Sequence, residues 1–127
     1  MRLALLALAL TACGAPAAHS VPEITFAELQ PLVNAKSVVL IDVNGTDSYK
    51  EGHIPGAIDF AANANNLAAV LPTDKAALVV AYCGGPSCGA WEKGATAVAS
   101  LGYHEVKHFT GGISGWTAAN GTLEAVQ

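Results

Sequence analysis

A cysteine stands at the end of an apolar run, directly before a glycine-rich turn. The segment from Ala77 to Trp91 reads A-L-V-V-A-Y-C-G-G-P-S-C-G-A-W. Residues 78–82 are apolar and rich in β-branched side chains, which is typical of a buried strand. A thiol between a strand end and a helix start meets backbone N–H groups and the positive end of the helix dipole, and both lower a thiol pKa. Cys83 is therefore predicted to be a reactive nucleophile.

The loop that follows this strand has residues suited to holding an anion. Gly84 and Gly85 allow the backbone to turn its amides inward, as an anion nest requires. Ser87 and Gly89 complete the expected substrate-binding segment. Lys93, one turn into the next helix, is the only nearby cation. It is either a weak substrate ligand or an ordinary solvated lysine.

The N-terminal segment has the form of a signal peptide. Residues 1–12 carry one positive charge followed by an apolar run that is too short to span a bilayer. The sequence L-T-A-C ending at Cys13 resembles the lipobox of bacterial lipoproteins, which implies lipidation of Cys13 and a membrane anchor. We expect a location in the cell envelope, as a periplasmic or outer-membrane lipoprotein. Ordinary cleavage within residues 15–18 is the alternative and would give a secreted protein.

The cysteine count bears on the same question. The chain has three cysteines, and an odd number in an exported protein needs an explanation. If lipid modifies Cys13, then Cys83 and Cys88 remain as a pair in an oxidising compartment. Cys88 is either a small apolar filler at a helix start or a second redox-active thiol, and the sequence does not decide whether the two form a disulfide.

Composition excludes several function classes. The chain has 127 residues, enough for one domain, and a net charge of −4. Arg2 is the only arginine, and the lysines are scattered singly, at positions 36, 50, 75, 93 and 107. Without a basic patch, we expect no nucleic-acid binding. His104 and His108 could share a strand face, but two histidines without a third ligand do not make a metal site, so we expect no metal and no cofactor.

Strands and helices alternate through residues 23–127, after a linker at 13–22 that is rich in small residues. We predict strands at 38–43, 57–60, 78–82 and 106–109, and helices at 25–33, 47–51, 65–71, 91–101 and 113–119. The first helix opens with a capping-box pattern at Thr25 and Glu28. Apolar strands in this order indicate an α/β fold with a central, mostly parallel sheet flanked by helices on both faces. Cys83 then lies at the carboxyl edge of the sheet, where ligands bind.

Three ordered motifs resemble the rhodanese family. Residues 40–57 read L-I-D-V-N-G-T-D-S-Y-K-E-G-H-I-P-G-A and are similar to its I-D-V-R and E-Y-x-x-G-H-I-P-G-A pattern. Residues 79–83 resemble its V-V-x-Y-C strand, and residues 102–116 its G-Y-x-x-V and G-G-i-x-x-W ending. The resemblance spans residues 23–119 and implies a single rhodanese-like domain. Family members are sulfurtransferases that carry a sulfane sulfur as a persulfide on the loop cysteine, alongside inactive relatives and some phosphatases.

The chain departs from the family pattern in the loop. Residues 83–90 carry no charge where the family has an arginine or another polar residue, so bidentate capture of thiosulfate or phosphate is impossible. The segment from Cys83 to Gly102 is two residues longer than usual, and Trp91, a packing residue, replaces a small serine. Asp42 and His53 match family positions that we interpret as scaffold.

The resemblance implies a sulfurtransferase with a thiosulfate- or polysulfide-type donor, and the N-terminal segment adds the expectation that it is exported and membrane-anchored. Its partners would be a small sulfur-containing substrate or a protein thiol acceptor. Cys88 is an addition to the family pattern, and its functional interpretation is a resolving cysteine that attacks the persulfide on Cys83 or closes a disulfide with it, against the simpler one of an apolar filler. Two alternatives stay open, namely an inactive binding module that uses the same loop and a thiol–disulfide protein that uses both cysteines.

Overall fold

The computed structural model describes residues 20–127, so the predicted signal peptide, Cys13 and most of the predicted linker lie outside it. The strands are β1 (Val39–Asp42), β2 (Ile58–Asp59), β3 (Val79–Tyr82) and β4 (Val106–His108). The helices are α1 (Phe26–Asn34), α2 (Thr46–Glu51), α3 (Phe60–Asn63), α4 (Leu67–Val70), α5 (Trp91–Ser100) and α6 (Gly112–Ala118).

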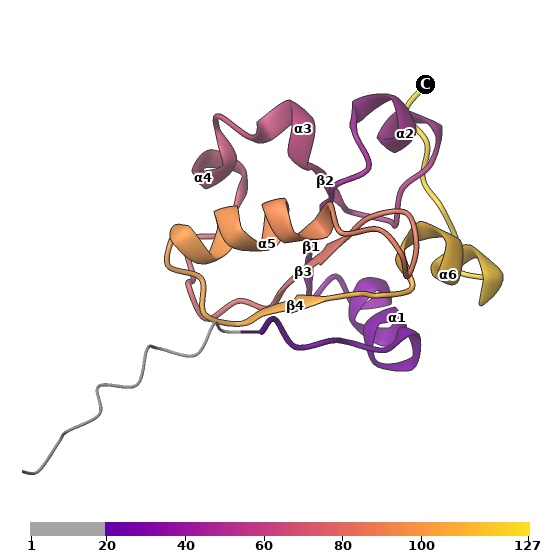
Figure 1. Cartoon of the computed structure of the whole chain (residues 1–127), viewed down its shortest axis with the longest axis horizontal. Coiled ribbons are helices and arrows are strands. Elements are labelled where there is room, and N and C mark those ends of the chain that lie inside the picture. Colours follow the sequence, from indigo (N-terminus) through magenta and orange to yellow (C-terminus); the bar gives the residue numbers. More distant parts are fainter. Residues whose placement is uncertain (1–19) are drawn as a thin grey trace, which may run out of the picture.

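The four strands form one parallel sheet in the order β2-β1-β3-β4 (Figure 1). In the central pair, Leu40 lies opposite Val80, and Asp42 lies opposite Tyr82. Each strand is joined to the next by at least one helix, as parallel pairing requires. The prediction of a parallel α/β sheet is confirmed.

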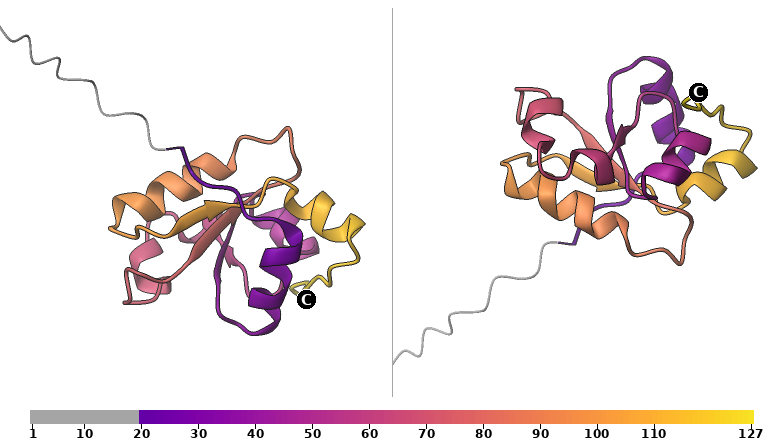
Figure 2. Two further views of the ribbon diagram at one scale, coloured as in Figure 1. Left: turned by 90° about the horizontal axis from the view of Figure 1, so that it is seen from below. Right: turned by 90° about the horizontal axis from the view of Figure 1, so that it is seen from above.

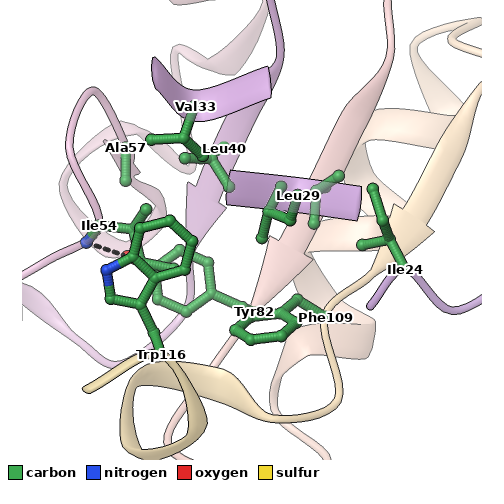
Figure 3. Close-up of a cluster of buried hydrophobic side chains, with 10 residues drawn as sticks. Ile24, Leu29, Val33, Leu40, Ile54, Ala57, Tyr82, Phe109 and Trp116 are labelled. Atoms are coloured by element: carbon green, nitrogen blue, oxygen red, sulfur yellow. Dashed lines mark hydrogen bonds between the residues drawn. The ribbon is translucent and has the colours of Figure 1, made fainter. Parts of the chain in front are cut away.

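Alternate side chains of the strands enter two separate cores, one on each face of the sheet. Leu40, Val80 and Tyr82 pack with α1 and with Trp116 of α6 (Figure 3). Ile41 and Val79 pack on the other face, with α4 and α5. The two edge-on views in Figure 2 show these helices on opposite sides of the sheet. Helices therefore cover both faces, as the apolar strands predicted.

The predicted capping box begins α1. The Thr25 hydroxyl oxygen accepts a hydrogen bond from the Glu28 amide at 3.2 Å, and the Thr25 amide donates to the Glu28 carboxylate at 3.3 Å. These bonds satisfy amides that have no partner within the helix. The Thr25 hydroxyl also donates to the Glu28 carboxylate at 2.8 Å, and this bond, together with the one from the Thr25 amide, lowers the pKa of Glu28.

Two predicted elements have different bounds in the structure. The strand predicted at 57–60 is limited to Ile58 and Asp59, because Asp59 instead caps α3 by accepting a hydrogen bond from the Ala62 amide. The helix predicted at 65–71 is the shorter α4, and α3 precedes it. The suggestion that His104 shares a strand face with His108 is wrong, because His104 precedes β4 and is exposed.

Helix α5 lies unusually close to the sheet at a glycine. A Cβ atom at Gly94 would lie 2.8 Å from Cγ2 of Val43 and 3.1 Å from Cγ2 of Ile41. The absence of a side chain therefore allows this close contact between α5 and the β1 segment. Within residues 20–127, no helix has both the length and the apolar character to cross a membrane.

Candidate functional site

Cys83 directly follows β3, at the carboxyl edge of the sheet, and its exposed fraction is 2%. The loop of residues 83–90 then leads to the start of α5 and lies beside α6 (Figure 1). The two neighbours of this loop, α5 and α6, pack on opposite faces of the sheet. The predicted position of Cys83, at the end of a buried strand, is therefore confirmed.

Cys83 and Cys88 are joined by a disulfide, with their Cα atoms 6.3 Å apart. A tight turn brings the second cysteine back to the first, since the Cys88 amide donates a hydrogen bond to the Gly85 carbonyl at 3.0 Å. Pro86 occupies the second position of this four-residue turn, where its fixed φ is favoured. The structure thus brings together the two cysteines that the sequence singled out.

The N-terminal end of α6 holds the loop in place through two backbone hydrogen bonds. The Ile113 amide donates to the Cys83 carbonyl and the Ser114 amide to the Gly84 carbonyl, each at 2.9 Å. These bonds satisfy both the first amides of α6 and two carbonyls of the loop. The backbone on either side of the Cys83 side chain is therefore held in a fixed position.

Gly112 makes this contact possible. Its φ is +60°, in the left-handed region, and a Cβ atom there would lie 2.6 Å from the Cys83 carbonyl oxygen and 2.7 Å from the Gly85 nitrogen. Only glycine fits both the conformation and the space. Sequence reasoning interpreted the segment around Gly112 as a packed closing turn and missed that it supports the cysteine loop. The paired glycines at 111 and 112 were the available signal.

The predicted substrate-binding residues lie along the same loop. Gly84 and Gly85 are partly exposed, and Ser87 and Gly89 are exposed. Lys93 is exposed on the first turn of α5, as expected of a solvated lysine. The Cys88 amide is already bonded to Gly85, so an anion at the loop would meet the other amides. That these residues, Gly84, Gly85, Ser87, Gly89 and Lys93, bind substrate stays a prediction.

A surface hollow borders the loop on its α2 side. It encloses about 430 Å³ and is lined by residues of four segments: Asn44, Ser48, Glu51, Gly52, Gly84, Ile113 and Leu123. Asn44 also lies near the loop backbone, since a Cβ atom at Gly84 would be 3.7 Å from its amide oxygen. Glu51 places a carboxylate rather than a cation in this hollow, which disfavours a small dianion held there by charge alone.

Trp91 packs against β4 instead of lining the loop. Its indole stacks on the imidazole of His108, with ring centroids 3.7 Å apart and an interplanar angle of 1°. Burial lowers the pKa of His108, whose Nδ1 atom has no hydrogen-bond partner among the described residues. The interpretation of Trp91 as a packing residue is confirmed.

The side chain of Tyr82, the residue directly before Cys83, connects three segments through hydrogen bonds. The Tyr82 hydroxyl donates to the Asp42 carboxylate at 2.6 Å. It also accepts from the Ile54 amide at 3.0 Å, the bond drawn as a dashed line in Figure 3. Asp42 also accepts from the Asn44 amide at 2.8 Å. Burial raises the pKa of both Asp42 and Tyr82. These bonds confirm that Asp42 is a scaffold residue.

His53 is likewise structural. Its Nδ1 atom lies 2.8 Å from the Tyr49 carbonyl oxygen, and its ring stacks on that of Tyr49. Its Nε2 atom lies 3.6 Å from the exposed Glu124 carboxylate. The predicted backbone contact of His53 is confirmed. Across residues 20–127, no three His, Cys, Asp or Glu side chains gather closely enough to hold a metal ion.

Comparisons with known proteins agree with this architecture. Residues 25–119 match the Rhodanese-like domain family. Two proteins named thiosulfate sulfurtransferase GlpE, from Pseudoalteromonas translucida and Shewanella oneidensis, are 32% and 33% identical to this chain. Their alignments cover 76% and 73% of this chain and 89% of each relative.

A solved structure shares both fold and sequence. The BH2092 protein from Bacillus halodurans superposes with a TM-score of 0.71 at 33% identity, over 82% of this chain and 77% of that protein. The family match spans most of the chain, and the relatives align over nearly their whole length. The chain therefore belongs to the rhodanese-like domain family.

Proposed function

We propose that this protein is a sulfurtransferase that carries sulfane sulfur as a persulfide on Cys83. The position of Cys83 supports this most strongly, because the thiol stands at the carboxyl end of β3 in a loop anchored by α6. The relatives named thiosulfate sulfurtransferase share this domain. The donor class would be thiosulfate or a polysulfide.

The reaction begins with the reduced form of the protein. The Cys83 thiolate attacks the outer sulfur of thiosulfate, the bond between the two sulfur atoms of the donor breaks, and sulfite leaves. The resulting persulfide then passes its outer sulfur to an acceptor thiolate or another nucleophile, and Cys83 returns as a thiolate. The acceptor would be a small thiol or a thiol of a partner protein.

The thiolate must be stabilised without a side-chain cation. An ordinary cysteine pKa of about 8.5 leaves only a small thiolate fraction at neutral pH. A helix N-terminus contributes about 0.3–1 kcal/mol, and one pKa unit corresponds to about 1.4 kcal/mol. A helix N-terminus alone is therefore worth less than one pKa unit, and the amides of the loop would have to supply most of the stabilisation of a thiolate at this position.

Mass spectrometry of the intact protein tests the proposal. The Cys88→Ala variant, reduced and then freed of reductant without air, should gain one sulfur atom from thiosulfate or polysulfide. The Cys83→Ala variant should gain none. If neither donor adds sulfur to a protein that contains Cys83, the sulfurtransferase function is wrong, and a non-catalytic binding module or a thiol–disulfide protein is favoured instead.

We also propose that the protein is exported and anchored to a membrane through lipid on Cys13, which lies outside the described residues. The support is the signal-peptide form of residues 1–12 and the lipobox-like sequence that ends at Cys13. A Cys13→Ala variant expressed in bacteria should move from the membrane fraction to the soluble fraction. Membrane association that persists in this variant would refute the anchor.

A thiol–disulfide function is the second candidate, and the Cys83–Cys88 disulfide favours it. In that case the reduced protein would reduce a partner's disulfide and become oxidised itself. It would exchange rapidly with a small dithiol–disulfide pair and would take no sulfur from thiosulfate or polysulfide. The mass measurement above therefore separates the two functions.

A further inference from the structure

We propose that Cys88 gives the protein a second output, in which the persulfide on Cys83 is released as hydrosulfide and the Cys83–Cys88 disulfide is left behind. This inference rests on the proposed sulfurtransferase function. It adds an activity that simple sulfur transfer lacks, because the sulfur leaves reduced and the protein becomes oxidised. The observations that carry it are the reach of Cys88, the anchoring of Cys83 and the unequal burial of the two residues.

Cys88 reaches Cys83 without any rearrangement of the backbone. Their Cα atoms are 6.3 Å apart, within the usual separation for bonded cysteines. The hydrogen bond from the Cys88 amide to the Gly85 carbonyl closes the turn between them, and Pro86 restricts that turn in the reduced protein as well. The loop is therefore arranged for attack before any persulfide forms.

Cys83, the residue that Cys88 would attack, is held in place by α6. Ile113 and Ser114 of α6 bind the carbonyls of Cys83 and Gly84, so the Cys83 backbone cannot swing away from the turn. A thiol tethered over so short a loop has an effective concentration of millimolar order or above. An external monothiol acceptor therefore has to exceed about 1 mM to compete with Cys88 for the persulfide.

The step balances in atoms and electrons. The Cys88 thiolate attacks Cys83 Sγ, a bond forms between the two cysteine sulfurs, and the bond from Cys83 Sγ to the outer sulfur breaks. The outer sulfur leaves as hydrosulfide with the proton that Cys88 gave up. The two cysteines lose two electrons together, and the sulfane sulfur gains them. No other oxidant or reductant takes part.

Burial determines how the disulfide is reopened. Cys83 is 2% exposed, whereas Cys88 is only partly buried. An external thiol reaches a disulfide by direct attack on one sulfur, and access decides which one. A reducing dithiol, the class of partner required here, therefore forms its mixed disulfide with Cys88 and releases Cys83 as the thiolate that starts the next cycle.

The test measures sulfide and protein mass in the same reaction. Wild-type protein, reduced and freed of reductant without air, receives one equivalent of thiosulfate and no acceptor. We expect about one hydrosulfide per protein, with the protein at the mass of the disulfide, as the balanced exchange requires. The Cys88→Ser variant should keep the persulfide and release almost no sulfide. The Cys83→Ser variant should do neither.

The outcomes separate this inference from the function on which it rests. If Cys88→Ser gains sulfur and wild type also keeps a stable persulfide without releasing sulfide, Cys88 does not resolve it and the inference is wrong, while the sulfurtransferase function stands. If neither protein takes sulfur from thiosulfate or polysulfide, both fail. Disulfide formation without sulfide would mean oxidation by residual air and would also overturn the inference.

The site of reduction has its own measurement. The oxidised wild-type protein is treated with a small amount of a monothiol that carries a mass label, then quenched with acid and cleaved into peptides under acid. The loop contains both cysteines, so fragmentation of its peptide assigns the label. We expect the label on Cys88 in most molecules. A label mainly on Cys83 would refute the proposed order of the reopening step.

Discussion

Replacing Gly112 with alanine should both destabilise the fold and displace the cysteine loop. The residue has a φ of +60°, and an added Cβ would lie within 2.6–2.7 Å of three backbone atoms of residues 83–85. A left-handed conformation costs an L-residue about 1–2 kcal/mol. Forcing an extra carbon into a packed site costs about 1–3 kcal/mol more. Neither side of this contact is a flexible side chain, so the loop or α6 must move.

We therefore expect Gly112→Ala to lower the free energy of unfolding by about 2–5 kcal/mol. For a domain of this size, each kcal/mol lowers Tm by about 4–8 °C, so the midpoint should fall by at least about 8 °C. The displaced Cys83 carbonyl should also slow closure of the disulfide when the reduced protein meets a mild oxidant. Thermal unfolding of the reduced protein and timed trapping of free thiols measure the two effects separately.

Gly102→Ala is the matched control. Gly102 has a φ of +96°, but a Cβ atom there would meet nothing within 4 Å. This variant therefore has the backbone strain without the clash, and it lies far from the loop along the chain, after α5. If Gly112→Ala has the same melting temperature as Gly102→Ala and forms its disulfide at the wild-type rate, then α6 does not hold the loop in place.

Three further predictions concern the scaffold. Tyr82→Phe removes the hydroxyl that bonds to the Asp42 carboxylate and the Ile54 amide, so both lose a buried hydrogen-bond partner. Urea unfolding should show a free energy of unfolding lower by about 1–3 kcal/mol. Because burial lowers the pKa of His108, the unfolded chain takes up this proton first as the pH falls below about 6.5, so stability should decrease there. A His108→Phe variant, unfolded by urea across the same pH series, should show a smaller decrease, and an unchanged slope would contradict the assignment. Thr25→Ala removes the capping box of α1 and should cost about 1 kcal/mol by the same measurement, whereas no loss would mean that the cap contributes nothing.

Local patterns in the sequence were sufficient to predict the sheet and the position of Cys83 at the end of its central strand. Apolar runs bounded by turn residues identified the central strands, and the glycines after Cys83 marked the edge where its loop begins. The cap at Thr25 and the scaffold roles of Asp42 and His53 also follow from residues close in the sequence or from the family motif. In each of these cases, the interaction that decides the structure is local or is encoded in a recognisable pattern.

The missed features depend on contacts between segments far apart in the chain. The support of Cys83 by Ile113 needs α6 to dock under the loop, and nothing near Cys83 in the sequence encodes that. The stacking of Trp91 on His108 could not be predicted from the sequence for the same reason. Helix α3 was missed because Asp59 can serve either as a strand residue or as a helix cap, and its capping bond decided between them.

How closely α5 packs on the sheet also affects the relative position of the two cysteine sulfur atoms. Cys88 lies just before this helix, and Gly94 lies one turn inside it, in direct contact with the β1 segment. A helix behaves as a stiff rod, so a methyl group at that point would push its first turn outward and carry the end of the loop with it. The distance between Cys88 and Cys83 therefore depends on how deeply α5 packs on the sheet. That depth requires the hydrogen atom of Gly94 in the place where other residues have a Cβ atom.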